Sequence, residues 1–217
     1  MELFIQYSVS GLSTGAVYAL VALGLALIYR STRILNFAHG DISTCGAFVA
    51  FALLSLNVPF SVAALASLLS GAVLAMVFYF GILVPAQRRD ATHLGQIILT
   101  LGLGLILQGA VAYFGGTEPQ SFPFPLSEFK VYKVASVTLS QLSAGTLAAS
   151  LLGCFLFYLL VQRTKIGLAM RATSENLQAA QTLGIPTRQV LALSWGLAAA
   201  LGVLAGLFLA PALLLDP

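Results

Sequence analysis

The sequence predicts an all-α, polytopic helical membrane protein with about six transmembrane helices, the N-terminus outside and a short helix on the cytoplasmic side. Of its 217 residues, 59% are hydrophobic and only 8% are Asp, Glu, Lys or Arg, whereas a soluble domain has roughly 25% charged residues. The ten Lys and Arg residues are spread along the chain, so no face for nucleic acid is expected. The length leaves room for one transmembrane domain, residues 1–217, and for no large domain outside the bilayer.

The first three spans come from two uncharged stretches. Residues 3–29 form an apolar run without a basic start, which is typical of a true span and not of a cleaved signal peptide. Residues 42–87 form an uncharged run too long for one helix, and Pro59 divides it because the residue before a proline avoids helical geometry. The second helix is long enough only if it begins near residue 37. The expected spans are 8–29, 37–56 and 61–84.

The remaining spans come from three further uncharged stretches, residues 91–117, 134–162 and 189–215. Each is long enough to cross the bilayer once. The expected spans are 96–114, 141–162 and 189–210. Because Cys45 and Cys154 both fall inside predicted helices, we expect no disulfide framework.

Basic residues gather in alternate loops, which predicts the orientation. Eight are expected on one side and two on the other, and cytoplasmic loops carry the excess of Lys and Arg. The side with eight is therefore expected in the cytoplasm, with both chain ends outside. The eight are Arg30, Arg33, Arg88, Arg89, Arg163, Lys165, Arg171 and Arg188, and the two are Lys130 and Lys133.

Small residues recur at four-residue spacing in three spans, which predicts faces where helices approach closely. We expect packing between helices of this chain, and the alternative is a dimer interface. They are Gly11, Gly15 and Ala19, then Gly71 and Ala75, and then Gly202 and Gly206.

Polar side chains inside the predicted spans are sparse, and no Asp, Glu, Lys or Arg is expected near a midplane. Ion-coupled carriers usually need a buried ionisable group, so this counts against a self-powered secondary transporter. Gln96 and Gln108 of the fourth span are candidates for the lining of a pathway. The alternative is that they form hydrogen bonds with a neighbouring helix.

Residues 36–41, Asn-Phe-Ala-His-Gly-Asp, lie at the start of the second span. Asn36 is expected to cap that helix and Asp41 to complement its positive end. His39 and Asp41 could also suggest acid–base or metal chemistry, but two ligands do not fill a metal site. The other histidine, His93, lies in a different loop. We therefore expect a structural role, with no metal and no catalytic residue.

The loop at residues 163–188 predicts a short cytoplasmic helix. Ser174 is a plausible N-cap, Glu175 complements the helix dipole, and Gly184 followed by Pro186 ends the helix. A narrow apolar face would enter a groove on another protein, and the alternative is a helix lying flat on the membrane interface. The apolar positions of that face are Leu177, Ala180 and Leu183.

Three segments of the chain form a recognisable set: residues 15–29 (GAVYALVALGLALIY), 36–41 (NFAHGD) and 175–185 (ENLQAAQTLGI). With these segments in this order, the sequence resembles the permease subunits of branched-chain amino acid ABC transporters of the LivH type. The resemblance covers essentially the whole chain, and its last two segments are specific. Members of that family usually continue with more spans, so this chain is expected to be short at its C-terminus, as a truncated product or with the missing helices supplied from elsewhere.

The resemblance implies that the loop at 163–188 is a coupling loop, whose short helix docks into a groove of an ATP-hydrolysing subunit. It implies this role for Glu175, Ala179, Ala180 and Gly184, and the same predicted surface includes Arg171, Leu177 and Leu183. The segment at 36–41 is then a family motif with a structural or gating role, carried by Asn36, Phe37, His39, Gly40 and Asp41.

The resemblance also implies partners: ATP-binding subunits, a second related permease that completes the pore, a periplasmic substrate-binding protein and the lipid bilayer. The segment at 115–140 is either the outward surface on which the binding protein docks or a passive connector.

The expected function is that of a permease subunit of an ABC importer for branched-chain amino acids. It would lie in the cytoplasmic membrane of a bacterium or archaeon as a multi-pass protein without a cofactor. No Gly-x-x-x-x-Gly-Lys-Ser/Thr loop occurs in the sequence, so a separate ATPase subunit is expected to drive it. The alternatives are import of another small polar solute such as an amide or urea, a passive channel, and an intramembrane enzyme that uses His39 and Asp41.

Overall fold

The computed structural model describes residues 2–116, 118, 120–125, 131–134 and 137–213. Two short strands, β1 (Val131–Val134) and β2 (Val137–Ser140), pair as an antiparallel hairpin. The other regular elements are helical, which confirms the all-α class. They are α1 (Glu2–Thr32), α2 (His39–Ser55), α3 (Phe60–Phe78), the π-helical turn η1 (Tyr79–Leu83), α4 (Val84–Arg88), α5 (His93–Gly115), α6 (Gln141–Arg163), α7 (Lys165–Glu175), α8 (Leu177–Thr182) and α9 (Thr187–Leu213).

Among the described residues, five helical segments have the length and composition to cross a bilayer, and they correspond to the first, third, fourth, fifth and sixth predicted spans. They are Tyr7–Thr32, Phe60–Arg88, His93–Gly115, Gln141–Arg163 and Thr187–Pro211. Helix α2 has 17 residues and is therefore about 25 Å long, less than the about 30 Å of a hydrocarbon core. The predicted second span, 37–56, is thus not a full-length helix, because the helix begins only at His39.

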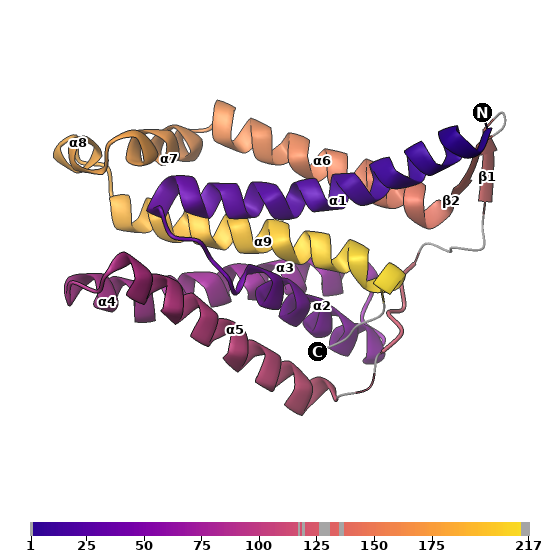
Figure 1. Ribbon diagram of the computed structural model, residues 1–217, viewed down its shortest axis with the longest axis horizontal. Coiled ribbons are helices and arrows are strands. Elements are labelled where there is room, and N and C mark those ends of the chain that lie inside the picture. The colour runs from indigo at the N-terminus through magenta and orange to yellow at the C-terminus, as the bar shows by residue number, and fades with distance from the viewer. Residues whose placement is uncertain (1, 117, 119, 126–130, 135–136, 214–217) are drawn as a thin grey trace.

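The segments that carry most of the basic residues lie together at one end of the bundle. The C-terminal end of α1, helix α4 and helices α7 and α8 share that end, whereas the N-terminus and the β1–β2 hairpin lie at the other (Figure 1). This arrangement agrees with the grouping predicted from loop charge. The assignment of the basic end to the cytoplasm remains a prediction of the positive-inside rule.

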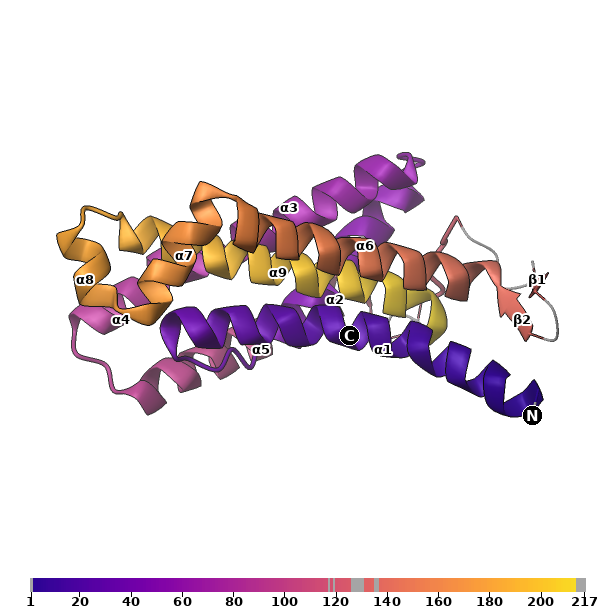
Figure 2. The same cartoon turned by 90° about the horizontal axis from the view of Figure 1, so that it is seen from above.

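Helix α9 is the central element of the bundle. In its most apolar window 72% of the residues are buried, against 22% in α5 and 11% in α6. Helices α1, α2 and α3 pack around it, and Figures 1 and 2 show α9 running between α1 and the α2–α3 pair. Helices α5 and α6 lie at opposite edges of the bundle in Figure 1.

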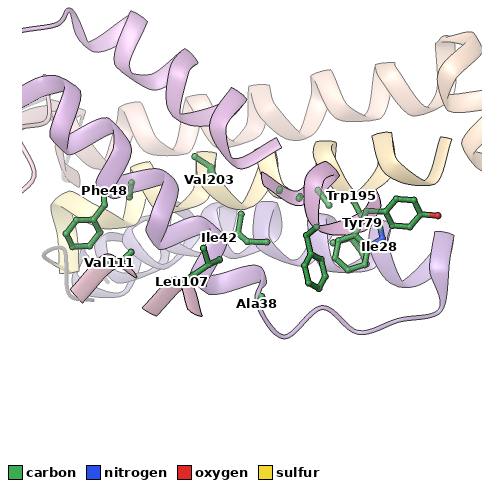
Figure 3. Close-up of a cluster of buried hydrophobic side chains, with 14 of the residues drawn as sticks. Ile28, Ala38, Ile42, Phe48, Tyr79, Leu107, Val111, Trp195 and Val203 are labelled. Atoms are coloured by element: carbon green, nitrogen blue, oxygen red, sulfur yellow. The ribbon is translucent and has the colours of Figure 1, made fainter. Parts of the chain in front are cut away.

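Close contact with α9 depends on glycine. The side chain of Val203 on α9 fits against Gly46 of α2 and Gly71 of α3, and a Cβ atom added at either glycine would lie 2.5 Å from Val203 Cγ2. Only the absence of a side chain at both positions therefore lets α2 and α3 approach the same residue of α9. Figure 3 shows Val203 within a buried apolar cluster that extends to Trp195 and Tyr79.

Two of the three predicted small-residue faces pack as expected. Gly71 and Ala75 of α3 are buried, and Gly202 and Gly206 of α9 lie against α2. On α1 the expected packing within the chain is wrong, because Gly11, Gly15 and Ala19 are exposed, and the alternative of a dimer interface stays untested there. Helix α1 instead buries Ala16, Val17 and Leu20. Small residues repeat on two sides of α1, and spacing alone does not show which side meets a neighbour.

Gly71→Val should destabilise the protein, because the new side chain would overlap Val203 in a packed core. We expect a loss of about 1–3 kcal/mol, as is usual for overpacking. The measurement is thermal unfolding in detergent, followed by the fluorescence of Trp195, which is buried and is the only tryptophan of the chain. Gly15→Val is the matched control, since an added Cβ meets nothing within 4 Å there. Equal shifts in both variants would contradict this account.

Candidate functional site

The segment between α1 and α2, residues 33–38, is not helical and runs along the inner face of α5. His93 Nε2 lies 2.6 Å from the carbonyl oxygen of Arg33, at the start of α5. Seven residues further along α5, the backbone N–H of Phe37 donates to Thr100 Oγ1 at 3.2 Å. From Arg33 to Phe37 the segment thus advances about 10 Å along the axis of α5. The segment is therefore close to extended.

Helix α2 therefore begins beside the middle of α5. Asp41 Oδ1 accepts a hydrogen bond of 2.8 Å from Gln108 Nε2. Asp41 also lies over Gly104, where an added Cβ would come 2.5 Å from Asp41 Oδ2. Gly104 is the central residue of α5, which extends from His93 to Gly115. The positive end of the α2 dipole and a carboxyl group thus lie at the middle level of the bundle, and Asp41 occupies the first turn of α2 as predicted.

This position corrects two expectations. No ionisable residue was expected near a midplane, yet Asp41 lies level with the centre of α5. Asn36 was expected to cap α2, but the residue before the helix is Ala38, and the helix has no side-chain cap. Asn36 Oδ1 instead accepts from the backbone N–H of Ala38 at 3.2 Å, which closes a local turn. Thr100, one of the few polar residues of the predicted fourth span, holds the segment to α5.

His39 is the residue that joins α2 to the core. Its side chain is 2% exposed and lies between Gly24 of α1 and Gly202 of α9, since an added Cβ at these glycines would come 2.7 Å and 3.0 Å from its ring. Neither ring nitrogen has a hydrogen-bond partner among the described residues. The imidazole ring therefore fills the space between the two glycines by packing alone. This position fits the structural role expected for the motif.

The opposite side of the α2 N-terminus faces outward. Phe37 and Gly40 are exposed, Asp41 is half-buried, and Gln108 is exposed. The structure therefore brings Asp41 and Gln108 together at the surface of this chain, on the side of α5. Gln96 does not join them, because it bonds to the carbonyl oxygen of Ala91 at 3.1 Å and to Gln87 at 3.0 Å.

The loop at residues 163–188 forms two helices, α7 and α8, rather than the single one predicted. Ser174 is not an N-cap, since it lies in the last turn of α7. Asn176 caps α8 instead, its Oδ1 accepting from Ala179 N at 3.0 Å. Sequence reasoning missed Asn176, because Ser174 is also a residue that favours an N-cap and only the fold of α7 places it inside a helix. Gly167 allows that fold, because an added Cβ there would collide with the backbone of Val161.

Gly184 ends α8 as predicted. Its φ is +80°, in the left-handed region that glycine adopts at helix ends. The N–H of Gly184 donates to Gln181 O and that of Ile185 to Ala180 O, both at 3.0 Å. This pair of hydrogen bonds is a Schellman motif, which satisfies the last carbonyl groups of the helix.

The predicted apolar face of α8 is divided between the chain itself and the solvent. Ala180 is 2% exposed and packs inward, whereas Leu183 is 80% exposed and Leu177 is also exposed. The inward position of Ala180 corrects the expectation that all three form one docking face. The other residues expected to couple to an ATPase are exposed: Arg171, Glu175, Ala179 and Gly184. Glu175 also lines a cavity of about 290 Å³ with Arg30, Arg33 and Ser174.

Among the residues that the structure describes, no group of three or more His, Cys, Asp and Glu side chains could hold a metal ion.

Comparison with known proteins assigns the chain to a family. Residues 7–215 match the family described as the branched-chain amino acid transport system / permease component. The chain belongs to this permease family. It is accordingly a multi-pass protein of the cell inner membrane, and because the family is a transport family, it is not an enzyme in the usual sense.

Three relatives show the range of the family. The high-affinity branched-chain amino acid transport system permease protein BraD of Pseudomonas aeruginosa is 28% identical over 95% of this chain and 70% of its own length. The probable branched-chain amino acid transport permease protein LivH of Methanocaldococcus jannaschii is 33% identical over 86% of this chain and 60% of its own. The autoinducer 2 import system permease protein LsrC of Escherichia coli is 30% identical over 91% and 54%. This permease thus spans between half and about two thirds of these relatives, and no solved structure matches it.

Gly202→Ala should destabilise this permease through His39, because the three heavy atoms nearest to the added Cβ all belong to the His39 ring. In a His39→Ala background the same change should become neutral or stabilising, since alanine is the better helix former. A double-mutant cycle on the free energy of unfolding should therefore give an interaction energy of about 0.5–3 kcal/mol. Additive effects of the two changes would show that His39 does not fill the gap between the glycines.

Proposed function

We propose that this chain is the permease subunit of an ABC importer that moves branched-chain amino acids across the inner membrane, driven by a separate ATPase subunit. The observation that carries the proposal is the match of residues 7–215 to the branched-chain amino acid permease family. The partners inferred from the family are ATPase subunits, a second permease and a substrate-binding protein on the outer side.

The α7–α8 pair is the proposed point of contact with the ATPase. Leu177 and Leu183 project from α8, outside the bundle at the basic end of the molecule (Figure 1). Exposed leucines on a capped helix are suited to a groove on another protein. Helix α7 packs against α1, α6 and α9, so a push on α8 would pass through α7 to the helices that hold His39. This route would link ATP-driven closure of the partner to the middle of the permease.

The proposed pathway passes the start of α2. Asp41 and Gln108 present a carboxylate and an amide there, and the N-terminal backbone N–H groups of α2 lack a side-chain cap. Transporters commonly place their substrate near the middle of the membrane, beside the end of an interrupted helix. Gln108 therefore stays a candidate for the lining of the pathway, and the intrachain bonds of Gln96 favour a structural role for that residue.

A second candidate function is the import of another small polar solute by the same mechanism. The observation that favours it is the 30% identity to a relative named as a permease for autoinducer 2. The relatives of this chain thus include a permease named for a solute other than an amino acid.

Transport by the complete system tests the proposal. The chain is co-expressed with the transporter subunits encoded beside it, reconstituted in proteoliposomes and supplied with the soluble binding protein. We expect ATP-dependent uptake of radiolabelled leucine, isoleucine or valine, and no uptake with a non-hydrolysable ATP analogue. ATP-driven uptake of a different solute alone would instead support the second candidate, and uptake without ATP would indicate a channel.

Leu183→Glu should weaken coupling to the ATPase without unfolding the chain, because the side chain is 80% exposed and its loss leaves no cavity. We expect the affinity for the ATPase subunit to fall about tenfold, the equivalent of about 1.4 kcal/mol, with a parallel loss of uptake. Leu56→Glu is the matched control: Leu56 is also a helix C-cap residue, is 73% exposed, and follows α2. Normal ATPase binding by Leu183→Glu would contradict docking through α8.

A further inference from the structure

A polar cavity lies where the ends of two helices meet at the basic end of the bundle. Its volume is about 290 Å³, and it is lined by Arg30 of α1, by Arg33 just after α1, and by Ser174 and Glu175 from the last turn of α7. Both views show the C-terminal end of α1 beside the α7–α8 pair (Figures 1 and 2). Two guanidinium groups and one carboxylate group therefore border a single space.

The opposite charges at this cavity do not touch. Among the described residues, Glu175 forms no ion pair within 4 Å with Arg30 or Arg33. The neighbouring hydroxyl group is turned back onto its own helix, because Ser174 Oγ donates to Arg171 O at 2.9 Å. The cavity has the volume of about ten water molecules, so α7 must shift towards α1 before the carboxylate can meet a guanidinium group.

Arg33 has an unusual backbone conformation. Its φ is +61°, in the left-handed region that a side chain makes unfavourable. The N–H of Arg33 donates to Tyr29 O at 2.8 Å, and His93 Nε2 lies 2.6 Å from its carbonyl oxygen. Hydrogen bonds on both sides thus hold this conformation where the chain leaves α1 and reaches α5, while the side chain borders the cavity.

A short segment connects Arg33 to the middle of the bundle. Residues 33–38 are close to extended, and the N–H of Phe37 donates to Thr100 Oγ1 of α5. Asp41, in the first turn of α2, follows Arg33 by only eight residues. An extended segment has little slack, so a displacement of Arg33 would be passed to the start of α2. Arg30 offers no such connection, because it lies within α1.

We propose that Glu175 pairs with Arg33 when the ATPase displaces α7 and α8, and that Arg33 thereby acts as the positioning residue for the start of α2. The inference rests on the proposed function, since it assumes an ATPase partner. It gives Glu175 a contact within this chain, whereas the family resemblance implies a contact with the ATPase. Both side chains are exposed, and an exposed ion pair changes an equilibrium by up to about fivefold. That is enough to favour one of two positions and small enough to be reversed in each transport cycle.

Exchange of the two charges tests the pair in the complete, reconstituted transporter. The readout is the number of leucine molecules taken up per ATP hydrolysed. In Glu175→Arg the two positive charges repel, so we expect this ratio to fall about fivefold to tenfold, and Arg33→Glu should have the same effect. The double variant restores opposite charges and should recover the ratio to within about twofold of the unaltered protein. Arg33→Lys keeps the charge and should also stay near the unaltered value.

The matched control combines Glu175→Arg with Arg88→Glu. Arg88 is exposed on α4 at the same end of the bundle, but it does not line the cavity, so no recovery is expected. Recovery in this control would show that only total charge matters and would reject the pair, as would a double variant without recovery. The amount of ATPase subunit that co-purifies should be equal in all variants, and its loss in Glu175→Arg would place Glu175 on the docking surface and overturn the proposal.

Disulfide formation gives a second readout that does not depend on charge. Cys45 and Cys154, the two native cysteines, are replaced with alanine, and Glu175→Cys is combined with Arg33→Cys. Oxidation with copper–phenanthroline should give about threefold or more disulfide with a non-hydrolysable ATP analogue than without nucleotide. Glu175→Cys with Arg88→Cys is the control and should give no disulfide in either condition. An equal or smaller yield with nucleotide for the first pair would contradict the proposal.

Leucine uptake by the unaltered complex separates this proposal from the proposed function. If that complex imports leucine and the charge exchange fails, only the pair is rejected. If it imports a different solute, the substrate is rejected, and the same ratio measured with that solute still tests the pair.

Discussion

The structure depends on how closely other helices can approach α9. Val203 reaches two neighbours at once only because Gly46 and Gly71 lack side chains, and His39 fits only between Gly24 and Gly202. In a membrane there is no hydrophobic drive to bring helices together, so dispersion contacts at close range supply the stability. The same close fit fixes the level at which α2 begins, where the proposed pathway passes.

The deep start of α2 costs free energy, which hydrogen bonds to the neighbouring helix α5 offset. A non-helical segment deep in the bundle leaves backbone groups without helical partners, which lipid cannot satisfy. Thr100 of α5 provides hydrogen-bond partners for two of these backbone groups. Its hydroxyl accepts from Phe37 N and lies 3.4 Å from the carbonyl oxygen of Leu35. The side chains of Ile34, Asn36 and Ala38 are buried against the bundle, whereas those of Leu35 and Phe37 are exposed. The interruption therefore places a polar helix end inside the bundle while most of its surroundings stay apolar.

The sequence predicts the long helices well and the site less completely. Helices α5 and α6 lie within a few residues of the predicted spans, because long uncharged stretches reflect the thickness of the membrane. The predicted start of α2, near residue 37, lies two residues from the observed start at His39. Its depth in the bundle could not be predicted, since hydropathy shows that a stretch belongs in the membrane but not at what depth a helix starts. The contact of Asp41 with Gln108 joins residues 67 positions apart, and local spacing carries no signal for it. The choice of Asn176 over Ser174 as a cap likewise depends on how α7 folds back on α6.

The short α2 also bears on how the protein enters the membrane. Helix α3 leads into α4 at the end of the bundle where α1 finishes (Figure 1), so the chain between them must cross to the far side and return. The outward crossing consists of residues 33–55, of which only the second part is helical and which carries Asp41. An aspartate at the centre of an inserting helix costs about 2.5–3.5 kcal/mol. This segment would therefore insert together with α1 and α3. The topology of the whole protein then depends on α1 and α3 holding the least hydrophobic crossing in the membrane.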